Sequence, residues 1–278
     1  MQVGIFVKTF AAPDALAAFK AARDAGYDVV QLNMAVLGGA SMPETIAPAD
    51  CEEMAAACAG SGVAICGVSG TYNMIHPDTA IRSDGFARLA ALIRAAPLMG
   101  TRLVTLCTGT RNPTDQWAHH PDNAGIEAWH ELLVEMAKAA LLAEECGVDL
   151  GIEPELANVV SSAEQARQLI DSLGSPRIKI VLDPANLFET ASAVEARTIV
   201  AQAVDLLADR IVMAHAKDRR ADGSFAAAGA GVVDFRHFVR SLRATGFNGP
   251  LVTHGLSEAE APTVAAFLRR VVSEETAA

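Results

Sequence analysis

The sequence lacks three features that would each have indicated a class of partner. It has no apolar run close to the ~18 residues that a membrane-spanning helix needs, and residues 1–10 carry neither the basic start nor the cleavage site of a secretory signal. It has no basic excess, because 22 Lys and Arg stand against 33 Asp and Glu, a formal charge of −11. Since phosphate backbones reward clustered Lys and Arg, we expect a cytoplasmic protein that binds neither a membrane nor a nucleic acid.

Paired cysteines and several catalytic motifs are missing as well. The five cysteines are odd in number and include no CxxC pair, which predicts reduced, mostly buried thiols. No glycine is followed by lysine, so there is no P-loop, and no GxGxxG follows a strand to seat a nicotinamide cofactor. There is no HExxH, and Ser69 in GVSGT does not fit the GxSxG pattern of a nucleophilic serine.

What the sequence has is a regular alternation of two kinds of segment. Half of the residues (51%) are hydrophobic, which is typical of a globular protein. Short β-rich runs predict eight strands, over 3–8, 28–33, 63–69, 102–108, 148–153, 177–183, 210–215 and 250–254. Between and after them, Ala- and Leu-rich stretches predict helices near 13–25, 48–60, 83–99, 123–146, 161–173, 191–208, 234–245 and 257–273.

Residues that typically end or begin helices stand between these segments and support the same interpretation. Glycines that end helices precede several strands, at positions 26, 62, 100, 147 and 174. N-capping residues open the helical stretches, namely Asp14, Asp50, Asn123, Ser162, Asp234 and Ser257. Alternating strands and helices imply a parallel sheet, and eight such units imply a closed barrel. The predicted fold is therefore α/β, a single (β/α)8 TIM barrel domain covering residues 1–278.

In such barrels the active site lies at the carboxyl ends of the strands. Every predicted strand ends in, or runs into, polar side chains: Lys8, Asn33, Asn73, His76, Arg111, Glu153, Asp183, His215, Lys217 and His254. A polar residue can simply mark where a strand enters a solvated loop. All eight predicted strands end in this way, and four consecutive ones end in residue types that commonly bind metals. This pattern favours a functional site at the carboxyl ends of the strands.

Four of these residues form a candidate metal site. Glu153, Asp183, His215 and His254 follow one another at intervals of 30, 32 and 39 residues, each about one βα unit. The four side chains are therefore expected to converge on one rim of the barrel. Carboxylate oxygens suit Mn²⁺ or Mg²⁺, whereas imidazoles favour Zn²⁺, Fe²⁺ or Co²⁺. The alternative is that each histidine is a hydrogen-bonded structural residue.

The chain resembles the sugar phosphate isomerase/epimerase group of the xylose-isomerase-like barrels. The resemblance lies in GIEPE (151–155), VLDPANLF (181–188), AHAKD (214–218), GAGVVDF (229–235) and GPLVTHGLSE (249–258). It implies a divalent metal, often Mn²⁺, held by Glu153, Asp183 and His215. The fourth ligand of the family is a second Glu, and this chain has His254 in its place. DNA-repair endonucleases share the barrel but need a basic groove, which the charge of −11 argues against.

The resemblance also implies a reaction. Isomerising or epimerising a sugar beside its carbonyl removes a carbon-bound proton and stabilises an enediolate, which a metal assists as a Lewis acid. Glu153 is the first candidate for the base, and His254, where it is not a ligand, for the opposing acid. Lys217 is placed to neutralise an oxyanion, with a structural ion pair to Asp218 or near Asp183 as its alternative role.

The remaining rim indicates a sugar or sugar-acid substrate. The long segment 105–123 contains Arg111, Trp117 and His120, which are candidates to bind substrate, as are Lys8, Asn33, Asn73 and His76. Trp117 is suited to stacking on a sugar ring, or else it packs the loop down. Asn186 stands where several relatives place a substrate-binding His.

Two other functions remain open at this point. Inosose-dehydratase-like lyases share the HxKD pattern of residues 215–218, and the missing final Glu fits a barrel subunit without catalysis. The resemblance also implies assembly as a homo-oligomer, a dimer or a tetramer.

Overall fold

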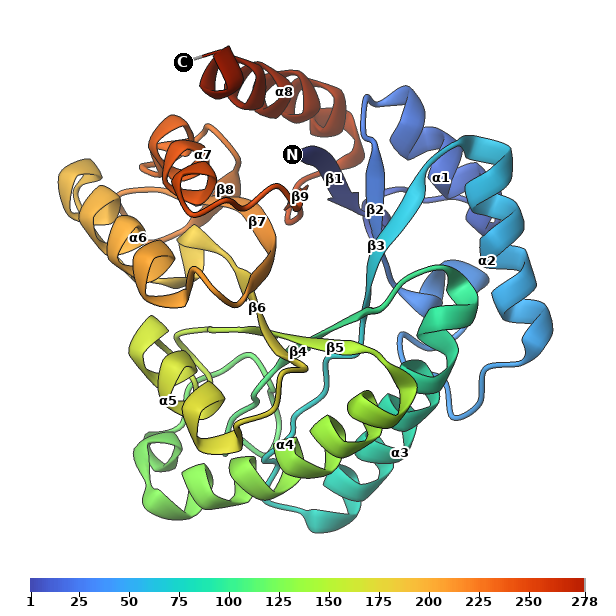
Figure 1. The fold of residues 1–278 in the computed structure, drawn as a ribbon, viewed down its shortest axis with the longest axis vertical. Helices are drawn as coiled ribbons and strands as arrows, with labels where there is room; N and C mark the ends of the chain where they lie inside the picture. The colour runs from blue at the N-terminus through green and yellow to red at the C-terminus, as the bar shows by residue number, and fades with distance from the viewer. Residues whose placement is uncertain (278) are drawn as a thin grey trace.

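The computed structural model describes residues 1–277 as a closed barrel of parallel strands inside a ring of helices (Figure 1). The eight barrel strands are β1 (Gln2–Phe6), β2 (Val29–Leu32), β3 (Ala64–Ser69), β4 (Leu103–Cys107), β5 (Asp149–Glu153), β6 (Ile178–Leu182), β7 (Ile211–Arg219) and β9 (Pro250–Thr253). Each pairs in parallel with its neighbours, and the β9–β1, β7–β9 and β6–β7 pairings close the ring. The predicted (β/α)8 TIM barrel is confirmed.

Eight helices cover the outside of the barrel. They are α1 (Ala15–Asp24), α2 (Pro48–Ser61), α3 (Thr79–Ala95), α4 (Ile126–Cys146), α5 (Ala163–Leu173), α6 (Ala193–Leu207), α7 (Phe235–Ala244) and α8 (Ala261–Ala277). Short 3-10 turns lie in the connections between strands and helices, at Val7–Thr9, Met34–Leu37, Ala96–Met99, Pro121–Ala124, Pro184–Asn186 and Glu258–Glu260. Among residues 1–277, no helix combines the length and the hydrophobicity needed to cross a bilayer.

The predicted element boundaries are close to those observed, with a few differences that have local causes. Asp14, Ser162 and Asp234 cap their helices with side-chain hydrogen bonds, as predicted. Asp50 instead lies inside α2, where its carboxylate accepts from the backbone N–H of Ala47. Helix α3 begins earlier than predicted because Asp78 caps it by accepting from the N–H of Ala80.

The N-cap prediction for Asn123 was wrong, and Ser257 caps the 3-10 turn that runs directly into α8 rather than α8 itself. Asn123 lies within the 3-10 turn before α4. The first strand ends at Phe6 rather than Lys8, because residues 7–9 turn into a 3-10 helix.

The sequence analysis also missed a hairpin. Strand β7 continues past His215 to Arg219 and pairs in antiparallel register with β8 (Phe225–Ala227). This hairpin projects from the carboxyl end of the barrel and carries Phe225, which is half exposed at 52%.

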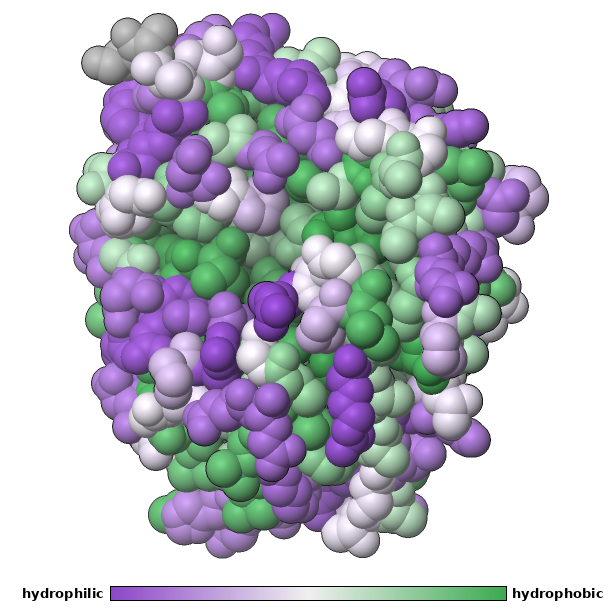
Figure 2. Space-filling view, turned by 45° about the vertical axis from the view of Figure 1, so that its right-hand side comes forward, coloured by the Kyte–Doolittle hydropathy of each residue, from purple (hydrophilic) through white to green (hydrophobic). Residues whose placement is uncertain are grey.

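Hydrophobic residues form two cores, one outside the barrel and one inside it. The outward faces of the strands pack against the helices in the main core. The inward faces form a separate apolar layer of Leu103, Val181, Met213 and Val252, which closes the interior. Gly151 leaves room for this layer, because a Cβ atom there would lie 2.8 Å from Val181 Cγ2. On the outer surface, the face in Figure 2 mixes hydrophilic residues with smaller apolar areas.

Strand alternation places a polar layer directly above this apolar one. Successive side chains on a strand point to opposite faces, so the inward position after Val181 is Asp183 and the one after Val252 is His254. On β7, His215 and then Lys217 follow Met213. The apolar layer is thus the floor on which the polar side chains stand.

Candidate metal centre

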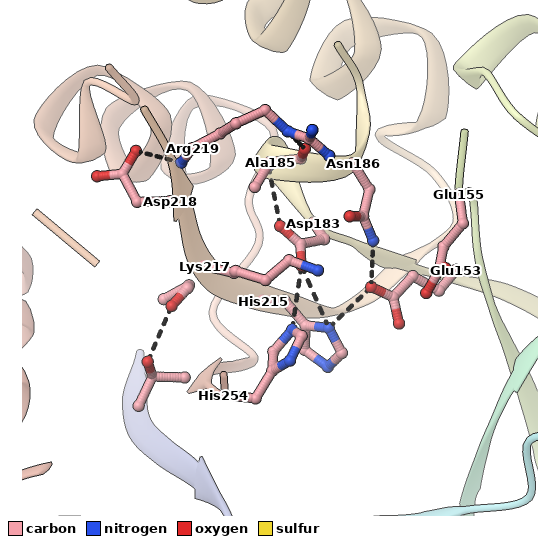
Figure 3. Close-up of polar contacts among 12 residues, drawn as sticks. Glu153, Glu155, Asp183, Ala185, Asn186, His215, Lys217, Asp218, Arg219 and His254 are labelled. Atoms are coloured by element: carbon pink, nitrogen blue, oxygen red, sulfur yellow. Dashed lines mark hydrogen bonds and ion pairs between the residues drawn. The ribbon is translucent and has the colours of Figure 1, made fainter. Parts of the chain in front are cut away.

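Four side chains converge above the apolar floor (Figure 3). Glu153 ends β5, Asp183 follows β6, His215 lies within β7 and His254 follows β9. These strands are consecutive neighbours around the barrel. One possible ligand atom from each of the four lies within 4.8 Å of the others. The structure thus brings together the residues that the spacing of one βα unit predicts.

Asp183 is the most deeply buried member of the cluster, with no exposed side-chain surface. Its Oδ1 atom accepts a hydrogen bond from the backbone N–H of Ala185 at 2.9 Å. Its Oδ2 atom faces the cluster and lies 3.1 Å from His254 Nε2, 3.4 Å from Lys217 Nζ and 3.9 Å from His215 Nδ1. One carboxylate oxygen therefore holds the loop after β6, while the other points at three nitrogens.

Glu153 is held on one side only. Its Oε1 atom accepts from Asn186 Nδ2 at 2.9 Å and lies 3.2 Å from His215 Nδ1. Within residues 1–277, its Oε2 atom has no hydrogen-bond partner. Since Glu153 also lines the central cavity, this oxygen is free to contact a bound molecule.

The orientation of the His215 ring is fixed from behind by Gln31. His215 Nε2 donates to Gln31 Oε1 at 2.8 Å, and Gln31 Nε2 in turn contacts Thr105 Oγ1 at 3.0 Å. With Nε2 donating, removal of the Nδ1 proton leaves a lone pair aimed at Glu153 and Asp183. A hydrogen bond to the far nitrogen is typical of histidines that ligate a metal.

The sequence analysis missed Gln31, although a signal was present. Gln31 is the one polar residue inside the otherwise apolar run of β2, and it is buried. A buried amide needs hydrogen-bond partners, which only the barrel interior supplies at that position.

The charges of the cluster reinforce one another. Burial alone would raise the pKa of the Glu153 carboxyl, but the His215 ring outweighs it and holds that pKa below its usual value. Burial would likewise raise the pKa of Asp183, and Lys217 with His254 keeps it well below its ordinary range. Both carboxylates are therefore ionised at neutral pH.

The basic residues of the cluster divide into two kinds. Burial opposes the charged form of His215 and Lys217, yet the facing carboxylates raise the pKa of both. For His254 burial is the larger effect, and its pKa is lowered despite the hydrogen bond to Asp183. His254 is thus a neutral imidazole at neutral pH, while Asp183 and Lys217 beside it carry charge.

This donor set fits a divalent cation. It offers two ionised carboxylates and two imidazoles, a combination of hard and intermediate ligands that suits Mn²⁺, Zn²⁺, Fe²⁺ or Co²⁺. The raised pKa of His215 shows that the two carboxylates already favour a positive charge at Nδ1. A bound divalent ion would supply that charge in place of the proton.

A cavity of about 1150 Å³ opens above the cluster. Four of the predicted substrate-binding residues line it, namely Lys8, Asn33, Trp117 and Asn186. So do several residues that the sequence analysis did not single out, among them Gln31, Glu155, Arg219 and Phe225. Lys217 also lines the cavity, with its ammonium 4.1 Å from the centre of the Phe225 ring.

Four other predicted residues do not reach this cavity, because they hold the surrounding loops. Arg111 forms an ion pair with Glu131 at 2.8 Å, and His120 accepts from the N–H of Asp122. Asn73 Oδ1 accepts from the N–H of Thr110 at 2.9 Å. His76 contacts the carbonyl of Pro113 at 3.0 Å, and it lines, with Asn73, a neighbouring hollow.

Glu155 lies two residues beyond Glu153 and faces the same cavity. Its Oε1 atom lies 3.4 Å from Cys107 Sγ. Burial and the nearby Glu153 charge raise the pKa of Glu155 to about 7. The cavity therefore holds a carboxyl group that is partly protonated at neutral pH.

Asp218, the last residue of AHAKD (214–218), holds the GAGVVD segment (229–234) in place. Its buried carboxylate accepts from the backbone N–H groups of Arg219, Gly229, Gly231 and Val233. A Cβ atom at Gly231 would lie 2.4 Å from that carboxylate, so the position requires glycine. Asp218 fastens the segment after the hairpin, and Lys217 is left to pair with Asp183.

Comparison with known proteins supports the same architecture. A family model described as "Xylose isomerase-like TIM barrel" matches residues 19–271. No curated protein matches the sequence.

Solved structures resemble the chain over nearly its whole length. The 3-keto-D-glucoside 4-epimerase YcjR of E. coli is 17% identical with a TM-score of 0.73, and 100% of each chain is covered. A D-psicose 3-epimerase of Clostridium cellulolyticum H10, solved with D-tagatose, is 17% identical with a TM-score of 0.74, covering 98% of this chain and 99% of the other. The IolI protein, solved with a bound zinc atom, is 15% identical with a TM-score of 0.74 and 99% coverage of both. At these identities the likeness shows the fold alone.

Proposed function

Because the chain belongs to the xylose isomerase-like TIM barrel family, we propose that it is a divalent-metal-dependent isomerase or epimerase of a sugar-derived keto compound. The observation that carries the proposal is the convergence of Glu153, Asp183, His215 and His254 at the base of a large cavity. Sugar epimerases among the structural neighbours support the substrate class.

The metal would be held by Glu153, Asp183 and His215, with His254 as a fourth ligand or as an acid–base group. When bound, a divalent ion supplies Lewis acidity that polarises a substrate carbonyl. Mn²⁺ is the ion that we expect, and the IolI neighbour with its zinc atom supports testing Zn²⁺ beside it.

Glu153 is the group that we assign to proton removal. Its Oε1 atom is fixed by Asn186 and His215, while Oε2 has no hydrogen-bond partner among residues 1–277. A carboxylate so held presents one free oxygen to the carbon beside the carbonyl. General base catalysis requires this combination of fixed orientation and an available lone pair.

His254 and Lys217 complete the proton and charge transfers. Neutral His254 donates its Nε2–H to Asp183, which leaves the Nδ1 lone pair free; His254 would take up a proton from solvent at Nδ1 and return it to the substrate carbon. Lys217 carries its charge at the cavity wall, where it stabilises negative charge on a substrate oxygen. Lys8, Asn33 and Asn186 supply polar contacts for further substrate hydroxyls.

The test is the exchange of substrate hydrogen with solvent. Chelator-treated protein reloaded with Mn²⁺ or Zn²⁺ is incubated in D₂O with ketoses such as D-psicose, D-tagatose and D-fructose. We expect deuterium at a carbon beside the carbonyl together with an isomer of unchanged composition, and loss of both in Glu153→Gln. A product that has lost water would identify a lyase instead. Absence of exchange for every ketose and metal would contradict the proposal.

A further inference from the structure

A second hollow adjoins the central cavity on the side of β3 and β4. Its volume is about 580 Å³, and it shares Ser41, Thr71, Gln116 and Trp117 with the larger cavity. The two spaces are therefore adjacent, with these four residues at their common boundary, and one lies over the metal cluster while the other lies beside the loop that contains Trp117.

The central cavity alone is larger than a single hexose requires. Cavities of ~300–1000 Å³ enclose most of a drug-sized ligand, and the central cavity alone measures about 1150 Å³. A free ketohexose is smaller than such ligands. It would leave both the outer part of this cavity and the second hollow to solvent.

Trp117 lines both cavities. Hydrogen bonds hold its backbone in place, whereas its side chain is exposed. The Trp117 N–H donates to Asp115 Oδ1 at 2.8 Å, and Thr110 Oγ1 donates to the carbonyl of Ala118 at 2.9 Å. The Trp117 residue is nevertheless 52% exposed. The ring does not pack the loop down, so it is available as a flat apolar surface for another ring.

Polar groups stand beside this ring without partners of their own. Ser41 and Gln116 line both spaces, and within residues 1–277 their side chains make no hydrogen bond. The outer wall is fixed, because Arg88 is paired with Asp84 at 2.7 Å and with Glu44 at 2.9 Å. An aromatic face flanked by free hydroxyl and amide groups is suited to the apolar face and the hydroxyl edge of a sugar.

We propose that the substrate is a glycosylated keto sugar. Its keto-sugar unit occupies the metal cluster, and a second sugar ring lies against Trp117 and extends into the second hollow. This inference rests on the proposed function, since it names the substrate class of the same site.

Calorimetric titration of the metal-loaded protein tests it with matched sugars. D-Fructose is compared with turanose, palatinose and lactulose, disaccharides in which a second ring is joined to fructose at different positions. At least one disaccharide should bind about tenfold more tightly than D-fructose, as stacking on one aromatic ring allows. Trp117→Ala should abolish this advantage, and Trp117→Tyr should keep part of it. The control Trp129→Phe, on α4 away from both spaces, should leave it unchanged.

The inference is overturned if no disaccharide binds more tightly than D-fructose, or if the advantage survives in Trp117→Ala. Solvent hydrogen exchange on D-fructose, measured in the same samples, separates the two proposals. Exchange without a disaccharide advantage would leave the proposed function standing and remove the second ring site. A Trp117-dependent advantage without exchange on any of the four sugars would do the reverse.

Discussion

The two halves of the barrel rim differ in what they place at the strand ends. Strands β5, β6, β7 and β9 each carry a titratable group within the strand or directly after it, and these groups contact one another, with Glu153, Asp183 and His215 buried. On the other side, Lys8 after β1 and Asn33 after β2 line the central cavity, and the loops after β2, β3 and β4 contribute residues that line the second hollow. In the function that we propose, the first half carries out the chemistry and the second determines what shape of molecule can reach it.

The difference also predicts how each half tolerates change. Buried charges are stable only when paired, so removing one member of the cluster leaves others uncompensated. Loop residues such as His120 lie at the surface and can change at little cost. Substitutions in the cluster, or in the side chains that hold it, should therefore have larger effects than substitutions in the surrounding loops, and four variants test this from the largest effect to the smallest.

His215→Ala should have the largest effect. Loss of this ligand should weaken Mn²⁺ or Zn²⁺ binding by more than about 100-fold, measured by calorimetry, because the cluster loses one of its two imidazoles and the one that faces both carboxylates. The circular dichroism spectrum should show a folded chain. His130→Ala, on the exposed face of α4, is the matched control and should bind metal as the parent does. Equal metal affinity in His215→Ala and the parent would remove His215 from the site.

Gln31→Leu should come next, although Gln31 is not one of the four proposed metal ligands. Removing the acceptor for His215 Nε2 frees the ring to turn and to change tautomer. Loss of such a supporting hydrogen bond typically costs 10–100-fold in metal affinity. Gln31→Glu keeps the acceptor oxygen and should retain most of the affinity. Should Gln31→Leu bind metal like the parent, the orientation of His215 would not depend on this contact.

Glu155→Gln should change how stability depends on pH. The pKa of Glu155 is raised to about 7 in the folded chain, so folding favours its protonated form. Its ionisation therefore costs stability as pH rises from its unfolded pKa through about 7. In urea unfolding of metal-free protein, the variant should gain about 1–2 kcal/mol on the parent between pH 5 and pH 8. Parallel stability curves over this range would show that Glu155 ionises normally.

His120→Ala should have the smallest effect. His120 accepts a hydrogen bond within the 3-10 turn before α4 and does not line the cavity. Metal affinity should stay within about twofold, and stability within about 0.5 kcal/mol, as for most surface substitutions. A large loss of sugar binding in this variant would mean that the loop moves into the cavity when substrate binds.

The two halves also differ in how much the sequence reveals. Glu153, Asp183, His215 and His254 could be brought together from spacing alone, because strand ends in a barrel are regular and the intervals match one βα unit. The sequence identifies Trp117 as a candidate to stack on a sugar ring, but it does not predict whether the side chain is exposed or packs against the loop. Arg111 was misplaced because its partner, Glu131, lies on a helix that follows the loop.

Two further features depend on contacts that a sequence read element by element does not show. Gln31 acts through residues on β4 and β7, far away in the chain. The hairpin of β7 and β8 has only three residues in its second strand, with Phe225 exposed, so its pattern is too short to indicate a strand. Local periodicity predicts elements, whereas these features arise only when distant elements meet.

The central claim is that Glu153, Asp183, His215 and His254 hold one divalent metal ion per chain. It is tested most directly by elemental analysis of the protein after chelation, reloading with Mn²⁺ or Zn²⁺ and removal of excess ion. The account predicts close to one ion per chain in the parent and almost none in Asp183→Asn. No retained ion in the parent, or an equal amount in the variant, would contradict it.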